Sequence, residues 1–247
     1  MGELIRIGAA EGAPPEAGLG ATVDTTGAWV TDLSIGEDYI LFPRDLVPTG
    51  GDELKFRGGM HPCSPYFGAD PDGDGPQHGY ARDVEWEVLA VDANSVILEH
   101  GRKPESSHMN LLQRLYYSTG MGCLLAQLNV ENIGEGEIRI QPGFHPYFAG
   151  PDPKNQADLK PVEFFKSDIY TPPRATTTST GYEVSIISRE MRNRVVWSDN
   201  VAEYHCIEPV ANPLTIQPGE SAEYSLELSI TPPWFFAKLK VDGKSGS

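Results

Sequence analysis

The sequence predicts an all-β fold, a large antiparallel β-sandwich, on three observations. Apolar and polar residues alternate with a period of two in many segments, which is typical of antiparallel strands with one buried face. Turn-forming clusters of Gly, Pro, Asn and Asp separate these segments. No amphipathic pattern of helical period extends beyond two turns. Such a chain can bury its apolar faces by packing one sheet on another.

The alternation defines the expected strands. The clearest case is 221–230, in which every second residue is apolar and the residues between are Ser or Glu. Residues 124–131 and 137–141 follow the same period, and turn signals at 92–94, 132–136 and 217–220 separate neighbouring segments. In chain order, the further strand candidates are 85–91, 95–99, 114–118, 182–187, 194–197 and 203–207.

Length and composition favour one domain. The chain has 247 residues and neither an internal repeat nor a low-complexity linker, so we expect a single domain over 1–242 and a flexible tail at 243–247.

Cys63, Cys123 and Cys206 are widely spaced, and the N-terminus lacks the apolar run of a signal peptide. We therefore expect a reducing, cytoplasmic location. No apolar run approaches the roughly 20 residues of a membrane span, so no membrane partner is expected.

The charge excludes one large class of partner. The formal net charge is −16, whereas nucleic-acid binding needs a basic surface. An anionic small molecule would need local arginines to reverse the field of the whole chain.

The segment 57–68 and the string 78–82 are the most informative parts of the chain. Both are rich in Gly, Pro, aromatic residues, His and Arg. Because proline lacks an amide donor and glycine permits special backbone angles, we expect a rigid loop here rather than a helix or a central strand. Rigid loops on a firm scaffold are where binding and catalytic residues concentrate.

Two further residues precede prolines, which restricts their backbone to extended geometry. These are His145 and Glu208, a plausible acid/base pair. Each also has an ordinary structural interpretation, His145 as a capping residue at a strand end and Glu208 as a rim carboxylate. Alternation within 203–207 and beyond predicts that Tyr204, Cys206 and Glu208 share one face of a strand.

Other chemistries fit less well. Residues 70–75 begin like a calcium loop, but Ala81 stands where a bidentate Glu is required, so an exposed turn is expected. The six histidines form no HxH or HExxH pair, and we expect neither a metal site nor a cofactor. A nucleophile elbow of the G-x-S-x-G type is also missing from the sequence.

Taken together, four strings resemble those of the aldose 1-epimerases, most closely the hexose-6-phosphate mutarotase-like branch. Their order and spacing match, and the similarity extends from about residue 20 to the strand near Ile230. The resemblance implies a galactose mutarotase-like supersandwich. The strings are Gly58-Gly59-Met60-His61-Pro62-Cys63-Ser64-Pro65-Tyr66-Phe67-Gly68, His78-Gly79-Tyr80-Ala81-Arg82, His145-Pro146-Tyr147-Phe148 and Cys206-Ile207-Glu208-Pro209.

The resemblance also implies a function. Enzymes of this family interconvert the α and β anomers of a hexose or hexose 6-phosphate by acid/base ring opening and reclosure, and they need no cofactor. By similarity, Glu208 is the general base at the C1 hydroxyl and His145 is the general acid at the ring oxygen. Arg57, His78 and Arg82 would bind the small-molecule sugar or sugar phosphate.

Some features depart from the family. His61-Pro62 stands where relatives carry a Trp-Pro pair, and the substrate-binding aspartate of many relatives has no clear counterpart, with Asp168 and Asp199 as candidates. Arginine binds neutral hydroxyls as well as phosphates, and we place the phosphorylated substrate slightly ahead.

Two other function classes stay open. One is a non-catalytic carbohydrate-binding or regulatory protein on the same scaffold. The other is a carbohydrate lyase or hydrolase, which is weaker because glycosidases need two carboxylates and only Glu208 lies in a suitable string. We expect a monomer or a weak homodimer.

Overall fold

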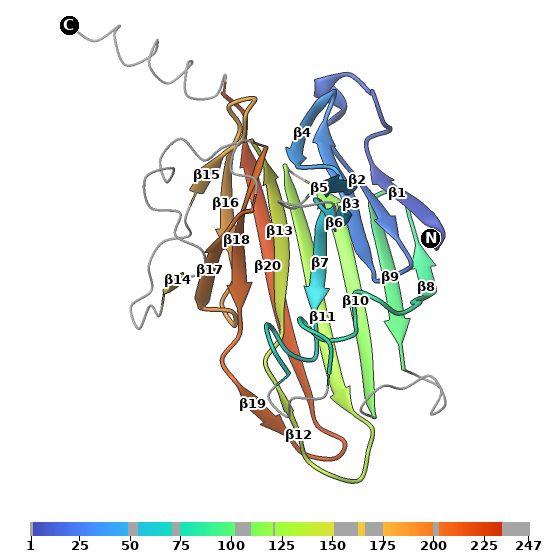
Figure 1. The fold of residues 1–247 in the computed structure, drawn as a ribbon. Coiled ribbons are helices and arrows are strands. Elements are labelled where there is room, and N and C mark those ends of the chain that lie inside the picture. The colour runs from blue at the N-terminus through green and yellow to red at the C-terminus, as the bar shows by residue number, and fades with distance from the viewer. Residues whose placement is uncertain are drawn as a thin grey trace, which may run out of the picture.

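The structure is a computed structural model. It describes residues 2–48, 54–70, 75–101, 110–120, 122–150, 163–165, 175–199 and 203–233. Within these ranges the elements are strands β1–β20 and one short 3-10 helix, η1 (Pro15–Ala17) (Figure 1). The predicted all-β class is therefore confirmed. The tail expected at 243–247 lies outside the described residues. Among the described residues, no helix combines the length and apolar character needed to cross a membrane.

The first layer is a nine-stranded sheet in the order β1-β2-β3-β4-β13-β18-β17-β14, with β7 beside β13 and β3. All of its pairings are antiparallel. Its strands are β1 (Leu4–Gly8), β2 (Leu19–Asp24), β3 (Trp29–Ile35), β4 (Asp38–Leu41), β7 (Met60–Cys63), β13 (Gly143–Ala149), β14 (Glu163–Phe165), β17 (Asn193–Trp197) and β18 (Tyr204–Val210).

The second layer is a seven-stranded antiparallel sheet in the order β15-β16-β20-β11-β10-β9-β8. Two ribbons, β5–β6 and β12–β19, complete the described strands. The second-layer strands are β8 (Glu87–Val91), β9 (Ser95–His100), β10 (Leu111–Gly120), β11 (Cys123–Asn132), β15 (Ala175–Thr177), β16 (Glu183–Ile187) and β20 (Ser221–Thr231); the ribbons are β5 (Asp45–Pro48), β6 (Leu54–Arg57), β12 (Ile138–Ile140) and β19 (Leu214–Ile216).

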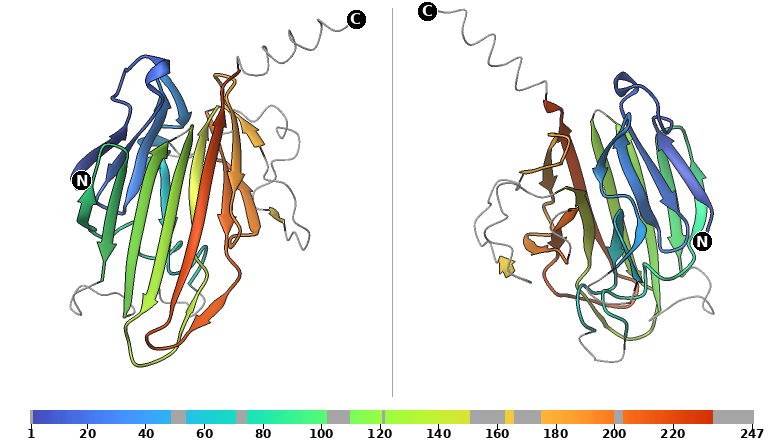
Figure 2. Two further views of the ribbon diagram at one scale, coloured as in Figure 1. Left: turned by 180° about the vertical axis from the view of Figure 1, so that it is seen from behind. Right: turned by 45° about the horizontal axis from the view of Figure 1, so that its top comes forward.

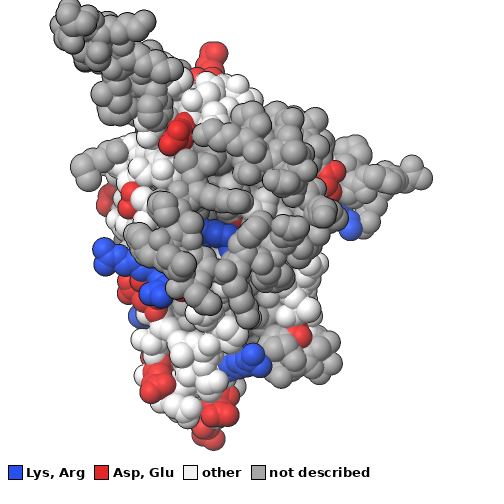
Figure 3. All heavy atoms as spheres, turned by 90° about the vertical axis from the view of Figure 1, so that its left-hand side faces the viewer, with Lys and Arg blue, Asp and Glu red and all other residues white. Residues whose placement is uncertain are grey.

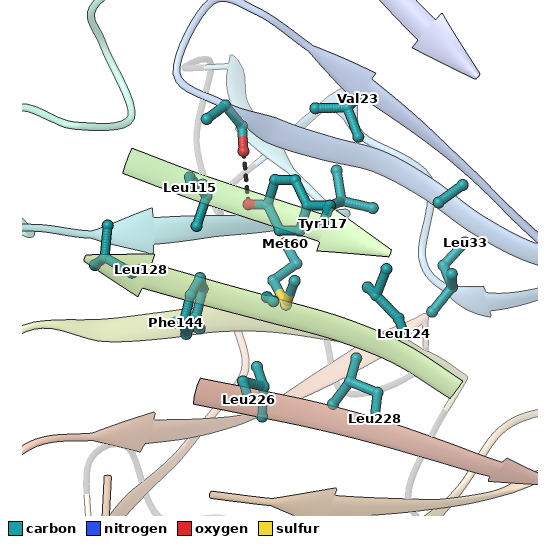
Figure 4. Close-up of a cluster of buried hydrophobic side chains, with 14 of the residues drawn as sticks. Val23, Leu33, Met60, Leu115, Tyr117, Leu124, Leu128, Phe144, Leu226 and Leu228 are labelled. Carbon is teal, nitrogen blue, oxygen red and sulfur yellow. Dashed lines mark hydrogen bonds between the residues drawn. The ribbon is translucent and has the colours of Figure 1, made fainter. Parts of the chain in front are cut away.

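The two sheets lie face to face, as the two views of Figure 2 show, and the core fills the space between them. The alternation predicted for 221–230 explains how β20 contributes to this core, because Tyr224, Leu226 and Leu228 are buried on one face of the strand. Figure 4 shows Leu226 and Leu228 in the same buried cluster as Tyr117 of β10, whose hydroxyl donates a 2.8 Å hydrogen bond to the Ala28 carbonyl. The nine-stranded sheet therefore has its inner face fixed against the core.

One expectation about segment 57–68 is wrong. Met60–Cys63 forms the buried strand β7, which pairs with β13, instead of remaining a loop. A proline is tolerated in this strand because the strand is short, and among its described residues it meets β3 only at Met60. The segment after Cys63 does leave the sheet, through a cis peptide bond between Ser64 and Pro65.

Candidate active site

The predicted acid and base lie side by side on adjacent strands. The register of β13 with β18 pairs Gly143 with Val210 and Tyr147 with Cys206, so His145 and Glu208 fall opposite one another. His145 Nε2 lies 3.4 Å from Glu208 Oε1. The strand register thus brings together two residues that are far apart in the sequence.

Strand alternation sends these side chains away from the core. Phe144, Phe148 and Ile207 are buried in the core, whereas His145 and Glu208 occupy the alternate positions on the same two strands. Cys206 clusters with Tyr147 and Tyr204 apart from the main core. The predicted common face of Tyr204, Cys206 and Glu208 agrees with this arrangement.

Burial controls the protonation of the pair. His145 is 5% exposed and Glu208 is 2% exposed. Burial raises the pKa of the Glu208 carboxyl well above its ordinary value, because the charged form loses its hydration. Burial also lowers the pKa of the His145 imidazole well below its ordinary value, and the positive field of His78, Arg82 and Arg57 lowers it further. Both shifts favour the neutral carboxyl and the neutral imidazole over their charged forms.

His78 approaches the pair from the loop that follows the β7 segment. Its ring centroid is 5.5 Å from that of His145, and the two rings meet edge to face. The Gly68 amide donates to His78 Nδ1 at 3.2 Å, which leaves the proton on Nε2. Burial and then the charge of Arg82 lower the pKa of His78 to about 4.

Special backbone angles hold this loop in place. His78 has a φ of 68°, which few non-glycine residues adopt, and Gly79 follows with a φ of 70°. A Cβ on Gly79 would come within 2.1 Å of the Ser64 carbonyl oxygen, so only glycine fits. Ser64 donates in turn to Gln113 of the opposite sheet, which itself donates to the Tyr80 hydroxyl. The loop is thereby tied to both layers.

A third histidine, His61, lies next to His145 on the neighbouring strand β7. It pairs with His145 in the register of β7 with β13, and the two rings stack with centroids 5.0 Å apart. Its Nδ1 lies 3.3 Å from the Pro62 carbonyl, and its Nε2 is buried without a hydrogen-bond partner among the described residues. Sequence reasoning missed this residue as a site member because it treated the segment as a loop. Its place in the site depends on the pairing of β7 with β13, which the segment alone does not reveal.

The two predicted arginines differ in what they bind. Arg57 donates to one oxygen of Asp199 through Nε at 3.0 Å and Nη2 at 2.8 Å, and its guanidinium lies over Trp197. Burial alone would raise the pKa of Asp199, but hydrogen bonds from Arg57 and Tyr204 hold it below its ordinary value.

Among the described residues, the Arg82 guanidinium makes fewer hydrogen bonds than the Arg57 guanidinium. Its Nη2 donates to the Gln77 carbonyl at 3.0 Å, and its Nε lies 3.7 Å from Asp83, beyond hydrogen-bond distance. The Nε group is buried and has no hydrogen-bond partner among the described residues. The other aspartate candidate, Asp168, lies outside the part of the chain that the structure describes.

Two observations concern metals, one on a predicted segment and one that the sequence did not predict. The calcium-like segment 70–75 falls largely outside the described residues, although Asp70 accepts a 2.6 Å hydrogen bond from the Gly75 amide. Within the described residues, His145, Cys206 and Glu208 form a group whose ligand atoms all lie within 4.8 Å of one another. No spacing within the sequence indicates this group, because it spans two strands.

The surface on the side of β14–β18 is electrically mixed. Figure 3 shows Lys and Arg side chains interspersed with Asp and Glu on its described parts. On this side, the net charge of −16 therefore does not produce a uniformly acidic surface.

Comparison with known proteins supports the motif-based resemblance. The family model "Aldose 1-epimerase" matches residues 52–172. A Salmonella typhimurium protein named "Putative glucose-6-phosphate 1-epimerase" is 30% identical over 125 residues, which cover 46% of this chain and 39% of that protein. The match thus spans about two fifths of the relative's length. The resemblance to the aldose 1-epimerase family is confirmed.

Solved structures support the fold. A protein from Synechocystis sp. PCC 6803 has a TM-score of 0.73 and 18% identity, covering 94% of this chain and 96% of its own. A galactose mutarotase-like protein from Lactobacillus casei has a TM-score of 0.69 and 14% identity, with coverages of 93% and 100%. The predicted galactose mutarotase-like fold is confirmed over nearly the whole chain.

Proposed function

We propose that this chain, a relative of the aldose 1-epimerases, is a mutarotase that interconverts the α and β anomers of a hexose or hexose 6-phosphate. The single observation that carries the proposal is the 3.4 Å approach of His145 Nε2 to Glu208 Oε1, on the face of the sheet that points away from the core. Of the residues expected to bind substrate, His78 contacts the His145 ring, and the charges of Arg57 and Arg82 act on His145.

The spacing of the pair suits ring opening. The C1 hydroxyl oxygen and the ring oxygen of an aldose are bonded to the same carbon, so their proton donor and acceptor must lie close together. One group removes the hydroxyl proton while the other protonates the ring oxygen. Rotation about the C1–C2 bond and reclosure on the other face invert the anomeric centre. Each well-placed acid or base contributes roughly 10²–10⁴-fold to the rate.

The roles alternate between the two half-reactions. With Glu208 as base and His145 as acid in the opening step, the pair must first hold its proton on the imidazole. Burial favours the neutral forms of both groups, and the direct contact of 3.4 Å provides a path for the proton to move between them when a polar sugar binds. On reclosure the roles are exchanged, which returns the pair to its starting state.

Substrate recognition would fall to the cationic groups. The Arg82 Nε–H group is a buried donor without a hydrogen-bond partner among the described residues, so a sugar or phosphate oxygen would satisfy it. Arg57 can bind the substrate only in competition with Asp199, or together with it. The name of the Salmonella relative favours a phosphorylated hexose, and the Arg57–Asp199 pair suits the hydroxyls of a neutral sugar.

Anomer exchange measured by NMR tests the proposal. Purified chain is added to equilibrated glucose, galactose, glucose 6-phosphate and galactose 6-phosphate, and exchange between the anomeric resonances is compared with the buffer rate. We expect acceleration for at least one sugar. Acceleration restricted to the phosphates identifies the hexose 6-phosphate branch. Binding without acceleration for any sugar rejects the proposal and favours a carbohydrate-binding protein.

A further inference from the structure

His145, Cys206 and Glu208 combine three ligand types that zinc commonly takes in proteins: an imidazole nitrogen, a sulfur and a carboxylate oxygen. All three residues are buried, and their ligand atoms lie within 4.8 Å of one another. Cys206 and Glu208 are two positions apart on β18, so their side chains emerge on the same face, and His145 faces them from β13.

The geometry fits a tetrahedral ion. With metal–nitrogen and metal–oxygen distances of about 2.0–2.1 Å, the edge joining two ligands of a tetrahedron is about 3.3–3.4 Å. The observed His145 Nε2 to Glu208 Oε1 distance is 3.4 Å. A metal–sulfur distance of about 2.3 Å gives edges of about 3.5 Å from the sulfur to the other two ligand atoms, so the Cys206 sulfur must move closer to them by up to about 1.3 Å.

The charges also balance. A divalent cation, one thiolate and one carboxylate sum to zero, and a neutral assembly is what a buried site tolerates. The nearby Arg57 is already paired with Asp199, so its charge opposes the ion less than a free guanidinium would.

We propose that His145, Cys206 and Glu208 bind a thiophilic divalent metal ion such as Zn²⁺, and that the bound ion inhibits the enzyme by occupying its acid and base. The inhibitory half of this inference depends on the proposed mutarotase function, whereas the binding half does not. On binding, the thiol loses one proton and the His145–Glu208 pair loses the proton that it shares, so two protons are released for each ion. Three protein ligands leave the fourth tetrahedral position for water.

Cobalt provides a direct probe of the thiolate. Co²⁺ added to the full chain should give tetrahedral visible bands and a near-ultraviolet thiolate-to-cobalt charge-transfer band, and Zn²⁺ should displace both. Cys206→Ser should lose the charge-transfer band and bind Zn²⁺ more than about a hundredfold more weakly, because changes outside the ligand set alone cost 10–100-fold. Cys63→Ser is the matched control, since Cys63 is also fully buried but is not among the three ligands, and it should keep the band.

Inhibition is measured as the ratio of anomer exchange rates with and without Zn²⁺ within each variant, so that a changed basal rate does not enter. Zn²⁺ should abolish exchange in the wild-type chain, a chelator should restore it, and Cys206→Ser should need a much higher Zn²⁺ concentration. A cobalt spectrum without the thiolate band, or equal affinities in wild type and Cys206→Ser, would overturn the metal site. Lack of exchange without metal would instead reject the mutarotase function, and the cobalt spectrum would still test the site.

Discussion

Replacing Glu208 by Gln should separate activity from stability. The substitution keeps the size of the side chain, removes the carboxyl that we propose exchanges a proton with the sugar, and leaves an amide in contact with His145. We expect kcat/KM for anomer exchange to fall by about 10²–10⁴-fold, which corresponds to roughly 3–5 kcal/mol in the activation free energy. NMR exchange rates at several sugar concentrations measure this loss.

The same variant should fold as well as the wild type. Burial raises the pKa of Glu208 because it penalises the charged carboxylate, and a neutral amide of the same size does not carry that penalty. The contact with His145 is 3.4 Å, at the long end for a hydrogen bond, and its net contribution is about 1 kcal/mol or less. The melting temperature should therefore change little or rise.

Glu99→Gln is the matched control for this prediction. Glu99 is also 2% exposed, but it lies in the other sheet and accepts a 2.6 Å hydrogen bond from Arg114. Its replacement should cost about 1–3 kcal/mol of stability and leave anomer exchange unchanged. If Glu208→Gln exchanges anomers at the wild-type rate, or if it loses activity only because it unfolds, the assignment of Glu208 is wrong.

Three further outcomes test the site and the core that supports it. His78 has a pKa of about 4 in the folded state and about 6.5 in the unfolded state, so the unfolded state binds a proton first as the pH falls. The free energy of unfolding should therefore decrease by up to about 3 kcal/mol between pH 6.5 and pH 4. His78→Gln should reduce this pH dependence, measured by urea unfolding at several pH values. Tyr117→Phe leaves the Ala28 carbonyl without its buried donor and should cost about 1–3 kcal/mol in denaturant unfolding. Asp199→Asn removes the anion that competes with the substrate for Arg57. KM for hexose 6-phosphate should therefore fall a few-fold relative to KM for the unphosphorylated sugar, because a partly exposed ion pair contributes about 1 kcal/mol. Equal changes in the two KM values would contradict this role.

Periodicity predicted the sheets well because alternation is a local property that burial enforces. The segment 221–230 became β20 almost unchanged, and its buried leucines face the core as the pattern requires. Segment 57–68 was harder to predict, because proline and glycine content hides a four-residue strand whose pairing depends on β13, a distant part of the chain. Tertiary pairing overrode the local preference there.

Site geometry depended on register, which no single segment reveals. Motif strings identified His145 and Glu208 as a pair, but their separation of 3.4 Å follows from the alignment of β13 with β18. The alignment of β7 with β13 adds His61 on one side, and the alignment of β13 with β18 brings Cys206 beside the pair. Both additions needed a two-dimensional map of the sheet, because their partners lie on neighbouring strands.

In the mechanism that we propose, a single proton shared by His145 and Glu208 can serve a reversible isomerisation. Ring opening takes one proton from the sugar and returns one to it, and reclosure does the same in the opposite sense, so the pair neither gains nor loses a proton over the cycle. The pair therefore does not have to exchange protons with water between catalytic cycles, and its burial does not slow turnover. The stacked His61, with its Nδ1 on the Pro62 carbonyl and its pKa lowered mainly by burial, stays neutral beside the pair. A neutral neighbour supports His145 without adding a second charge that would oppose its protonation.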